Sequence, residues 1–367
     1  MVLGQGPVEA VGVTSVRPDP GFWKDRRVLL TGHTGFKGGW AAIWLHRMGA
    51  KVTGLALAPD QTPSLYDLAR VGELTDSRIV DLRDRAAVAG VVASGPFDVV
   101  LHLAAQPIVR ASVEDPIGTF ASNVMGTAHL LDALRTASRP RAVLCVTSDK
   151  VYANHETGRP FAEADALGGK DPYSASKAAT EMVVHSFARS YFDRAGVPVA
   201  TARGGNVIGG GDFSRDRLVS DIVRAVRAGQ VLSLRHPEST RPWQHVLDCV
   251  AGYLVYAEAL ASEAATPRAM NFGPRPGGAE IGVGALATEA LQALGATQGW
   301  RHEPDPQSIE AKALAIDTTL AEQRLGFVSR LDGPRAVRLT MDWYRDQHAG
   351  ADARALTLDQ IAAYESL

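Results

Sequence analysis

Compact apolar segments alternate with longer amphipathic segments through the first half of the chain. The short segments predict strands over residues 26–32, 51–57, 77–84, 97–105 and 141–148, and a sixth strand that runs into a glycine-rich turn within residues 197–209. The longer segments predict helices over residues 36–50, 118–137 and 174–196. Because the strands are mostly apolar on both faces, we expect an α/β fold: a Rossmann-type doubly wound parallel sheet covered by helices on both sides.

The pattern is looser after the last of these strands, where helical segments mix with short strand-like segments such as 231–236 and 269–274. It predicts a smaller C-terminal α/β substrate-binding lobe over residues 206–367. The dinucleotide-binding domain then spans residues 23–205, and the chain crosses back toward it near residues 240–262.

Composition narrows the classes of function. Lys and Arg number 38 against 40 Asp and Glu, a net charge of −2, so no basic field favours nucleic acid as a partner. No apolar run reaches the roughly 18 residues of a membrane span, and the N-terminus lacks a basic-then-apolar signal, so we expect a cytoplasmic protein with no membrane partner.

Cys145 and Cys249 are predicted to be buried free thiols, and no spacing of cysteine or histidine residues suggests a metal site. Residues 1–22 show no sustained period and are expected to form a flexible arm.

The segment TGHTGFKG places Gly32, Gly35 and Gly38 between the first predicted strand and the first predicted helix. Glycine lets a backbone approach a pyrophosphate closely, and a helix N-terminus offers free N–H groups and a positive dipole end. The spacing is GxxGxxG rather than GxGxxG, so the evidence lies in the strand–turn–helix context. We expect a dinucleotide to bind the three glycines together with Thr34, Phe36 and Lys37.

The second predicted strand does not identify the dinucleotide. An acid usually closes this strand in NAD-binding folds, but Asp60 comes several residues late, and no arginine stands there for a 2′-phosphate. We expect NAD, and NADP stays open. Asp81 and Leu82 end the third predicted strand, where the adenine would lie, although Asp81 could instead cap a helix.

Tyr173 and Lys177 lie four residues apart at the start of a predicted helix, so both side chains share one face. A nearby ammonium lowers the pKa of a phenol, and such a phenol can take a proton from an alcohol while hydride leaves the carbon. Ser148, at the end of the fifth predicted strand, could hydrogen-bond the same alcohol oxygen.

Together these features resemble the extended short-chain dehydrogenase/reductase family, whose members act mainly on nucleotide sugars. The segments HLAAQ and NVMGT, the second containing Asn123, fit the interior motifs of that family. The resemblance implies assembly as a homodimer or a dimer of dimers through helices that include the one carrying Tyr173. It also implies cofactor contacts from Leu103, Ala104 and Ala105.

Asp149 and Lys150 follow Ser148 directly. Sugar 4-epimerases of the family have no catalytic acid there, whereas its 4,6-dehydratases add a pair, which is Asp-Glu in the thymidine-linked enzymes. The Asp-Lys pair resembles the cytidine-linked branch, as do the segments GHTGFKGGW, AAQPIVR, GGNVIGGGD and RPWQHV. The resemblance implies a CDP-sugar substrate, dehydration to a 4-keto-6-deoxy sugar, and a place in deoxysugar biosynthesis such as that for lipopolysaccharide.

The chemistry of dehydration explains such a pair. Once C4 is a ketone, the C5 proton is acidic, and elimination needs one group to take it and another to protonate the leaving C6 hydroxyl. We expect Asp149 to be the acid and Lys150 the base, deprotonated by a partly apolar pocket and by Lys177. The roles could be reversed, Lys150 could stabilise an enolate as a cation, or the two could form a surface ion pair.

Cations and polar groups must hold the nucleotide diphosphate and the sugar. Each arginine among the candidates could instead form a surface salt bridge. The candidates are Gln106, Arg110, Asn206, Arg217 and Arg241.

The tryptophans Trp23, Trp40 and Trp44 are expected in the core, and His245 is expected to be a packed or hinge residue and not a catalyst. Three other functions stay open: a nucleotide-sugar 4-epimerase, a dehydratase of another nucleotide-linked hexose, and a nucleotide-sensing scaffold without activity.

Overall fold

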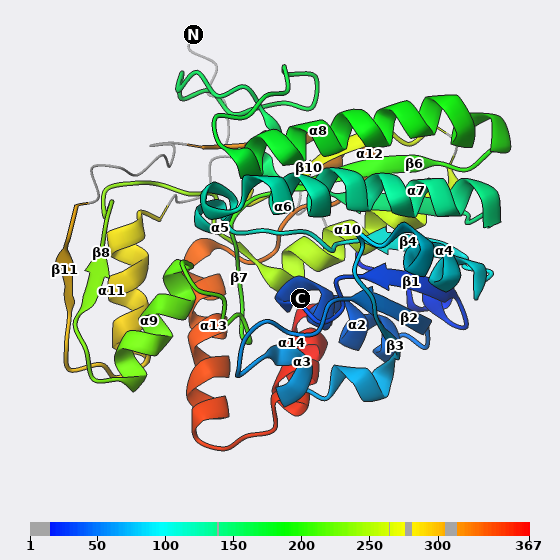
Figure 1. Cartoon of the computed structure of the whole chain (residues 1–367). Helices are drawn as coiled ribbons and strands as arrows, with labels where there is room; N and C mark the ends of the chain where they lie inside the picture. Colours follow the sequence, from blue (N-terminus) through cyan, green and yellow to red (C-terminus); the bar gives the residue numbers. More distant parts are fainter. Residues whose placement is uncertain (1–14, 138, 264, 276–280, 305–313) are drawn as a thin grey trace, which may run out of the picture.

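The computed structural model describes residues 15–137, 139–263, 265–275, 281–304 and 314–367. Its main feature is a seven-stranded sheet in which all neighbouring strands are parallel (Figure 1). In spatial order the strands are β10 (Ala269–Phe272), β6 (Val199–Gly204), β5 (Ala142–Val146), β4 (Val99–His102), β1 (Arg27–Thr31), β2 (Lys51–Ala56) and β3 (Asp76–Ile79). The winding reverses between β1 and β4, the place where open α/β sheets bind ligands. The predicted Rossmann-type sheet is confirmed.

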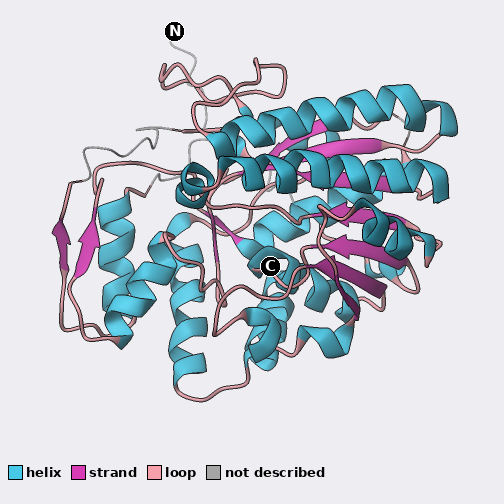
Figure 2. Cartoon of the chain, viewed as in Figure 1, coloured by secondary structure: helices cyan, strands magenta, loops and turns pink. Residues whose placement is uncertain are grey.

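Helices cover both faces of the sheet (Figure 2) because its strands are apolar on both faces. In β1, Val28 and Leu30 join one buried cluster and Leu29 joins the other. The Leu29 cluster includes residues of α4 (Arg85–Ala93), α7 (Gly126–Ala137) and α8 (Pro172–Phe187). The opposite cluster includes residues of α2 (Phe36–Arg47), α10 (Val246–Ser262) and α14 (Ala353–Glu365).

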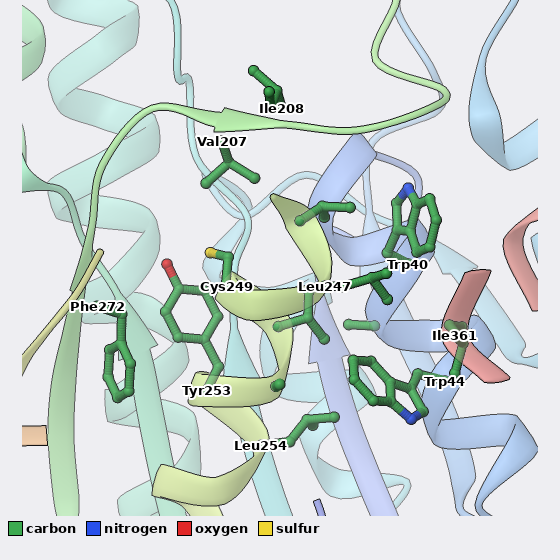
Figure 3. Close-up of a cluster of buried hydrophobic side chains, with 14 of the residues drawn as sticks. Trp40, Trp44, Val207, Ile208, Leu247, Cys249, Tyr253, Leu254, Phe272 and Ile361 are labelled. Atoms are coloured by element: carbon green, nitrogen blue, oxygen red, sulfur yellow. The ribbon is translucent and has the colours of Figure 1, made fainter. Parts of the chain in front are cut away.

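Part of the larger cluster lies between α2, α10 and α14. Figure 3 shows Trp40 and Trp44 of α2 beside Leu247 of α10 and Ile361 of α14. Trp23, Trp40 and Trp44 are at most 1% exposed, which confirms that these tryptophans belong to the core. The position of α14 means that the last helix of the chain supports the first helix of the dinucleotide-binding fold.

The smaller lobe contains two short parallel pairs of strands and several helices. One pair is β8 (Leu232–Leu234) with β11 (Trp300–His302), and the other is β7 (Val207–Ile208) with β9 (Gln244–His245). Its helices are α9 (Leu218–Arg227), α11 (Val283–Ala293) and α13 (Gly333–His348). Shorter helical segments elsewhere are α1 (Pro20–Trp23), α3 (Leu65–Leu68), η1 (Val71–Leu74), α5 (Val109–Glu114), α6 (Pro116–Phe120), η2 (Ala121–Met125), η3 (Asp149–Val151), η4 (Ala188–Phe192), η5 (Asp193–Ala195) and α12 (Thr319–Leu325).

One expectation about strands was wrong, and another was incomplete. The segment 269–274, assigned to the smaller lobe, supplies β10 at the edge of the main sheet. The sixth strand predicted within residues 197–209 is β6, but the glycine-rich turn expected after it leads into a second short strand, β7, which belongs to a different sheet. The break at Gly205 and Asn206 matters for the site, because it turns the chain away from the sheet beside β5.

The flexible arm expected over residues 1–22 lies mostly outside the described residues, but its last part is fixed. The Ser15 hydroxyl donates to the carbonyl of Val328 over 2.7 Å. The Asp19 amide donates to the Glu258 carboxylate of α10 over 3.0 Å. From Ser15 onward the chain is therefore held against the folded body, because its polar groups find partners there.

Among the described helices, none has the length and apolarity needed to cross a lipid bilayer. Cys145 and Cys249 are buried free thiols, as predicted. Within the described part of the chain, no group of three or more His, Cys, Asp or Glu side chains is placed to hold a metal ion.

Candidate active site

The glycine turn joins β1 to α2 and lies against the end of β4. Gly32 has a φ of +81°, and a Cβ atom there would lie 2.8 Å from the backbone nitrogen of Ala104. A Cβ on Gly38 would lie 2.0 Å from the Gly32 carbonyl oxygen, whereas one on Gly35 would meet nothing closer than 3.4 Å. Two of the glycines are thus required by packing within the protein, and the third keeps the start of α2 open.

The start of α2 keeps its amide groups available to a ligand. Gly35 is the N-cap residue and no side chain caps the helix. Thr34 turns its hydroxyl away, donating to the Leu57 carbonyl over 2.9 Å. An uncapped N-terminus of a 12-residue helix is a site for an anion such as a pyrophosphate.

The end of β4 forms the second wall beside the glycine turn. The backbone amides of Leu103 and Ala104 both donate to the Thr31 hydroxyl over 3.1 Å. Thr31 also contacts Nδ1 of His102 over 2.7 Å, and burial lowers the pKa of that histidine to about 3. These contacts fix the Leu103–Ala105 segment against the glycine turn.

The predicted adenine-side residues occupy a different local setting from the one expected. β3 ends at Ile79, so Asp81 follows the strand instead of closing it. Its carboxylate is paired with Arg83, which holds the pKa of Asp81 below its usual value. The cap of α4 is Asp84, so the alternative in which Asp81 caps a helix was wrong. Leu82 is buried against Gly126.

Ser148, Asp149 and Lys150 form a tight turn at the carboxyl end of β5. Ser148 caps η3: its Oγ accepts from the Lys150 amide over 3.2 Å and donates to Oδ1 of Asp149 over 3.0 Å. The Ser148 hydroxyl also lies close enough to the phenol of Tyr173 to favour its ionised form, and so opposes the rise of the Tyr173 pKa. The Lys150 ammonium lies 6.0 Å from the centre of the Tyr173 ring. The structure therefore brings these four side chains together.

Tyr173 and Lys177 lie on one buried face of α8, with 8% and 5% of their surfaces exposed. The Lys177 ammonium donates to the Val146 carbonyl over 3.2 Å. Burial, with a further contribution from the Lys37 ammonium, lowers the pKa of Lys177 to about 8. The expected lowering of the tyrosine pKa was wrong: burial raises the pKa of Tyr173, because desolvation of a phenolate outweighs the favourable contacts.

Asp149 is only 2% exposed, which rules out the surface ion pair as its role. A Cβ atom on Gly205 would lie 2.9 Å from Oδ2 of Asp149, and that oxygen has no hydrogen-bond partner among the described residues. Burial raises the pKa of Asp149, although Lys150 and Lys37 oppose the rise. A buried carboxyl with a raised pKa and one unpaired oxygen is suited to hold and donate a proton.

The predicted substrate arginines differ in how close they lie to this centre. Arg241 acts electrostatically on Asp149, and Arg217 acts on Tyr173. Arg217 also lies 3.6 Å from Asp212, and Arg110 pairs with Asp216 over 3.1 Å. The first two are thus near the reactive groups, while Arg110 has a carboxylate partner in the smaller lobe.

Gln106 and Asn206 make hydrogen bonds within the protein. The side chain of Gln106 donates to Thr119 over 2.8 Å and accepts from the amide of Ile108 over 2.6 Å. Asn206 follows Gly205 at the break after β6, and its backbone carbonyl accepts a hydrogen bond from the backbone amide of Gln244 over 3.0 Å. Both residues shape the loops that line the end of the sheet.

Sequence reasoning missed a buried ion pair behind the reactive groups, Glu181 of α8 and Arg203 of β6, joined over 2.8 Å. The available signal was the placement of charged residues in otherwise apolar positions. Glu181 lies four residues after Lys177 on the same helical face, and Arg203 stands in the apolar segment VATARGG.

Comparisons with known proteins agree with this geometry. The model of the NAD dependent epimerase/dehydratase family matches residues 28–273. The CDP-glucose 4,6-dehydratase of Salmonella typhimurium is 39% identical over 354 residues, which cover 95% of this chain and 98% of that protein. The dTDP-glucose 4,6-dehydratase of Streptomyces niveus is 29% identical over 336 residues, or 88% and 94% of the two chains.

Solved structures share the fold. The UDP-glucose 4-epimerase of Thermotoga maritima superimposes with a TM-score of 0.77 at 21% identity, over 88% of this chain and 99% of that one. At this identity the likeness concerns the fold alone.

Proposed function

The chain belongs to the NAD dependent epimerase/dehydratase family, and we propose that it is a nucleotide-sugar 4,6-dehydratase that converts CDP-D-glucose into CDP-4-dehydro-6-deoxy-D-glucose and water. The observation that carries the proposal is the buried Asp149 beside Lys150, in contact with Ser148 and within reach of Tyr173. The likeness to the Salmonella typhimurium enzyme over nearly the whole chain supports CDP-glucose as the substrate.

The cofactor would be NAD, held by the glycine turn (Gly32, Thr34, Gly35, Phe36, Lys37, Gly38), by Asp81 and Leu82, by the segment 103–105, and by Tyr173 and Lys177. The fit rests on the close packing at Gly32 and Gly38 and on the uncapped start of α2. When bound, NAD would supply the chemistry of hydride exchange with the sugar, first at C4 and then at C6.

The residues of the chain would manage the protons. Tyr173 takes the proton of the C4 hydroxyl, and Ser148 hydrogen-bonds the same oxygen. Lys177, whose pKa is lowered to about 8, supplies positive charge at neutral pH and can exchange protons near it. This charge favours the phenolate that Tyr173 must form against the cost of its own burial.

Elimination would then use the neighbouring turn. Lys150 takes the proton from C5, and Asp149 donates its proton to the C6 hydroxyl, so that the C6–O bond breaks and water leaves. The raised pKa of Asp149 supports this assignment over the reverse one, because it keeps the carboxyl protonated to a higher pH. Arg110, Asn206, Arg217 and Arg241, with Gln106, are assigned to the substrate, which lies between residues 23–205 and the smaller lobe.

The exposed apolar residues favour a homodimer. Ile117, Phe120 and Met125 on the α6–η2 helix are 77%, 37% and 50% exposed, and Met182 on α8 is 59% exposed. We assign this face to contact with a second copy of the chain. Light scattering on the wild type and on Ile117→Asp tests it, with a dimer and a monomer expected. We also propose that the protein acts in the cytoplasm, in deoxysugar biosynthesis.

The function is tested by incubating the protein with CDP-, dTDP-, UDP- and GDP-hexoses. We expect CDP-glucose to lose the mass of one water and, in D₂O, to gain deuterium at C5. An isomer of unchanged mass would indicate a 4-epimerase, and no turnover of any hexose would refute an enzyme. Lys150→Ala should abolish water loss yet leave C4 oxidation, whereas Lys170→Ala, which removes an exposed lysine paired with Glu156, should change neither.

A further inference from the structure

Glu181 and Arg203 form an ion pair inside the protein, immediately behind the reactive residues. Their side chains are 4% and 5% exposed. Arg203 donates from Nε to Oε1 over 3.0 Å and from Nη2 to Oε2 over 2.8 Å, so the pair is bidentate. Buried pairs of this kind rarely add stability over apolar residues of the same size, so their geometry is the more informative property.

The pair reaches both ends of the turn that carries Ser148, Asp149 and Lys150. On one side, the hydroxyl of Thr147 donates to Oε1 of Glu181 over 2.5 Å. On the other side, Nη1 of Arg203 donates to the phenol oxygen of Tyr152 over 2.9 Å. Thr147 precedes Ser148 and Tyr152 follows Val151, so the residues flanking the turn are tied to one rigid pair.

Tyr152 is itself held from two further directions. Its phenol donates to Oδ1 of Asn271 in β10 over 2.6 Å. Its ring stacks on Phe161, with the ring centres 4.9 Å apart and the planes within 4°. The far end of the turn is therefore fixed to two strands of the main sheet, β6 and β10.

The same pair connects to the oxidation residues. Glu181 lies one helical turn beyond Lys177 on α8, and its negative charge acts on the Lys177 ammonium. Thr201 of β6 donates to its second oxygen over 2.8 Å. Through Glu181, the helix that bears Tyr173 and Lys177 is thus locked to β6 and to Thr147, which connects β5 to the Asp149–Lys150 turn.

We propose that Glu181 and Arg203 are positioning residues that hold the Ser148–Val151 turn in register with α8, so that the oxidation and elimination groups act on one sugar ring. The proposal rests on the dehydratase function above. Two proton-transfer sites must serve neighbouring carbons of a single bound hexose, and a displacement of about 1 Å can slow such a step about a hundredfold.

Thr147 and Tyr152 are the two ends of the hydrogen-bond network around Glu181 and Arg203, and substitutions at these two residues give two different tests. Tyr152→Phe keeps the ring and its stacking but removes the hydrogen bonds at the elimination end. We expect it to slow water loss roughly ten- to a hundredfold while C4 oxidation persists, so that reduced cofactor accumulates at 340 nm during a single turnover. Thr147→Val removes the hydrogen bond at the Ser148 end and should slow C4 oxidation instead, without accumulation.

A matched control is Tyr256→Phe, which also removes one buried phenol hydrogen bond, to the Pro267 carbonyl over 2.6 Å, but leaves the network intact. It should keep wild-type rates for both steps. As a measurement without substrate, hydrogen exchange of amides 148–152 should be faster in Tyr152→Phe than in Tyr256→Phe.

Wild-type rates and wild-type exchange in both Tyr152→Phe and Thr147→Val would overturn the proposal. Equal slowing of both steps by both variants would also overturn it, since that indicates a general loss of structure. If the wild type removed no water from CDP-glucose, the proposed function would fail instead. The exchange measurement would still decide whether the pair positions the turn.

Discussion

Alanine at Gly38 is predicted to damage the cofactor turn even though it suits the helix. Gly38 lies in the first turn of α2, and a Cβ atom there would be 2.0 Å from the carbonyl oxygen of Gly32. Real Cβ atoms stay about 3 Å or more from such an atom, so α2 and the turn must separate by about 1 Å.

The magnitude follows from two opposing effects. Alanine is favoured over glycine in a helix interior by about 1 kcal/mol. Forcing a methyl group into a packed contact costs about 1–3 kcal/mol, and the upper part of that range, about 2–3 kcal/mol, applies here because the neighbour is rigid backbone. We therefore expect Gly38→Ala to lower the free energy of unfolding by about 1–2 kcal/mol. A 1 Å shift of the turn should also weaken NAD at least tenfold, about 1.4 kcal/mol.

Gly90 in α4 is the matched control, because it is also a helical glycine but a Cβ atom there meets nothing within 4 Å. Gly90→Ala should raise the free energy of unfolding by about 0.5–1 kcal/mol and leave NAD affinity unchanged. Urea denaturation measures the stability of both variants, and calorimetry with cofactor-free protein measures the affinity. If Gly38→Ala matched Gly90→Ala in both quantities, the close approach of the turn to α2 would be refuted.

Three further predictions concern pH. Lys177→Met should inactivate the enzyme yet raise its stability at pH 7 by about 3 kcal/mol, a gain that disappears above pH 10.5. The wild-type lysine has a pKa of about 8 in the folded protein against 10.5 in the unfolded chain. The wild-type protein therefore loses stability as the pH falls from 10.5 to 8 and loses no more below 8; thermal denaturation between pH 6 and 11 measures this. The pKa of Glu258 is raised to about 7, so this residue stabilises the fold below pH 4.5 and loses that contribution as the pH rises from 4.5 through 7. Glu258→Gln should therefore make the stability of the protein change less with pH between 4.5 and 7. Asp149→Asn should remove most of the elimination rate. It should also abolish the fall of that rate at high pH, where the wild-type acid loses its proton. Rapid-quench assays across pH measure both effects, and a fall that persists in the variant would mean that another group is the acid.

The parts of the fold that follow from local patterns were predictable. Apart from the polar edge strand β3, the strands of the main sheet up to β5 are short and mostly apolar, and the glycine turn stands between the first strand and its helix. The pairing of β10 was not predictable, because the four residues Ala269–Phe272 form a run too short to indicate which sheet it joins. That choice depends on contacts with β6, which lies far away in the sequence.

The reactive residues were also found from spacing, but their electrostatics were not. Tyr173 and Lys177 share a helical face, as their separation requires. The raised pKa of Tyr173 depends instead on how completely the surrounding loops bury it, and no periodicity reports that. Likewise, Glu181 and Arg203 look like isolated charges in the sequence and become partners only when α8 packs on β6.

The position of α14 has a consequence for the synthesis of the protein in the cell. Ile361 packs beside Trp44 of α2, and Glu365 accepts from the Trp44 indole over 2.9 Å and pairs with Arg47 over 3.0 Å. A ribosome makes the glycine turn long before it makes the residues of α14 that brace the helix after that turn. The nucleotide pocket of the nascent chain therefore stays incomplete until α14 has been made, and a premature stop before Ala353 would leave that pocket without its support.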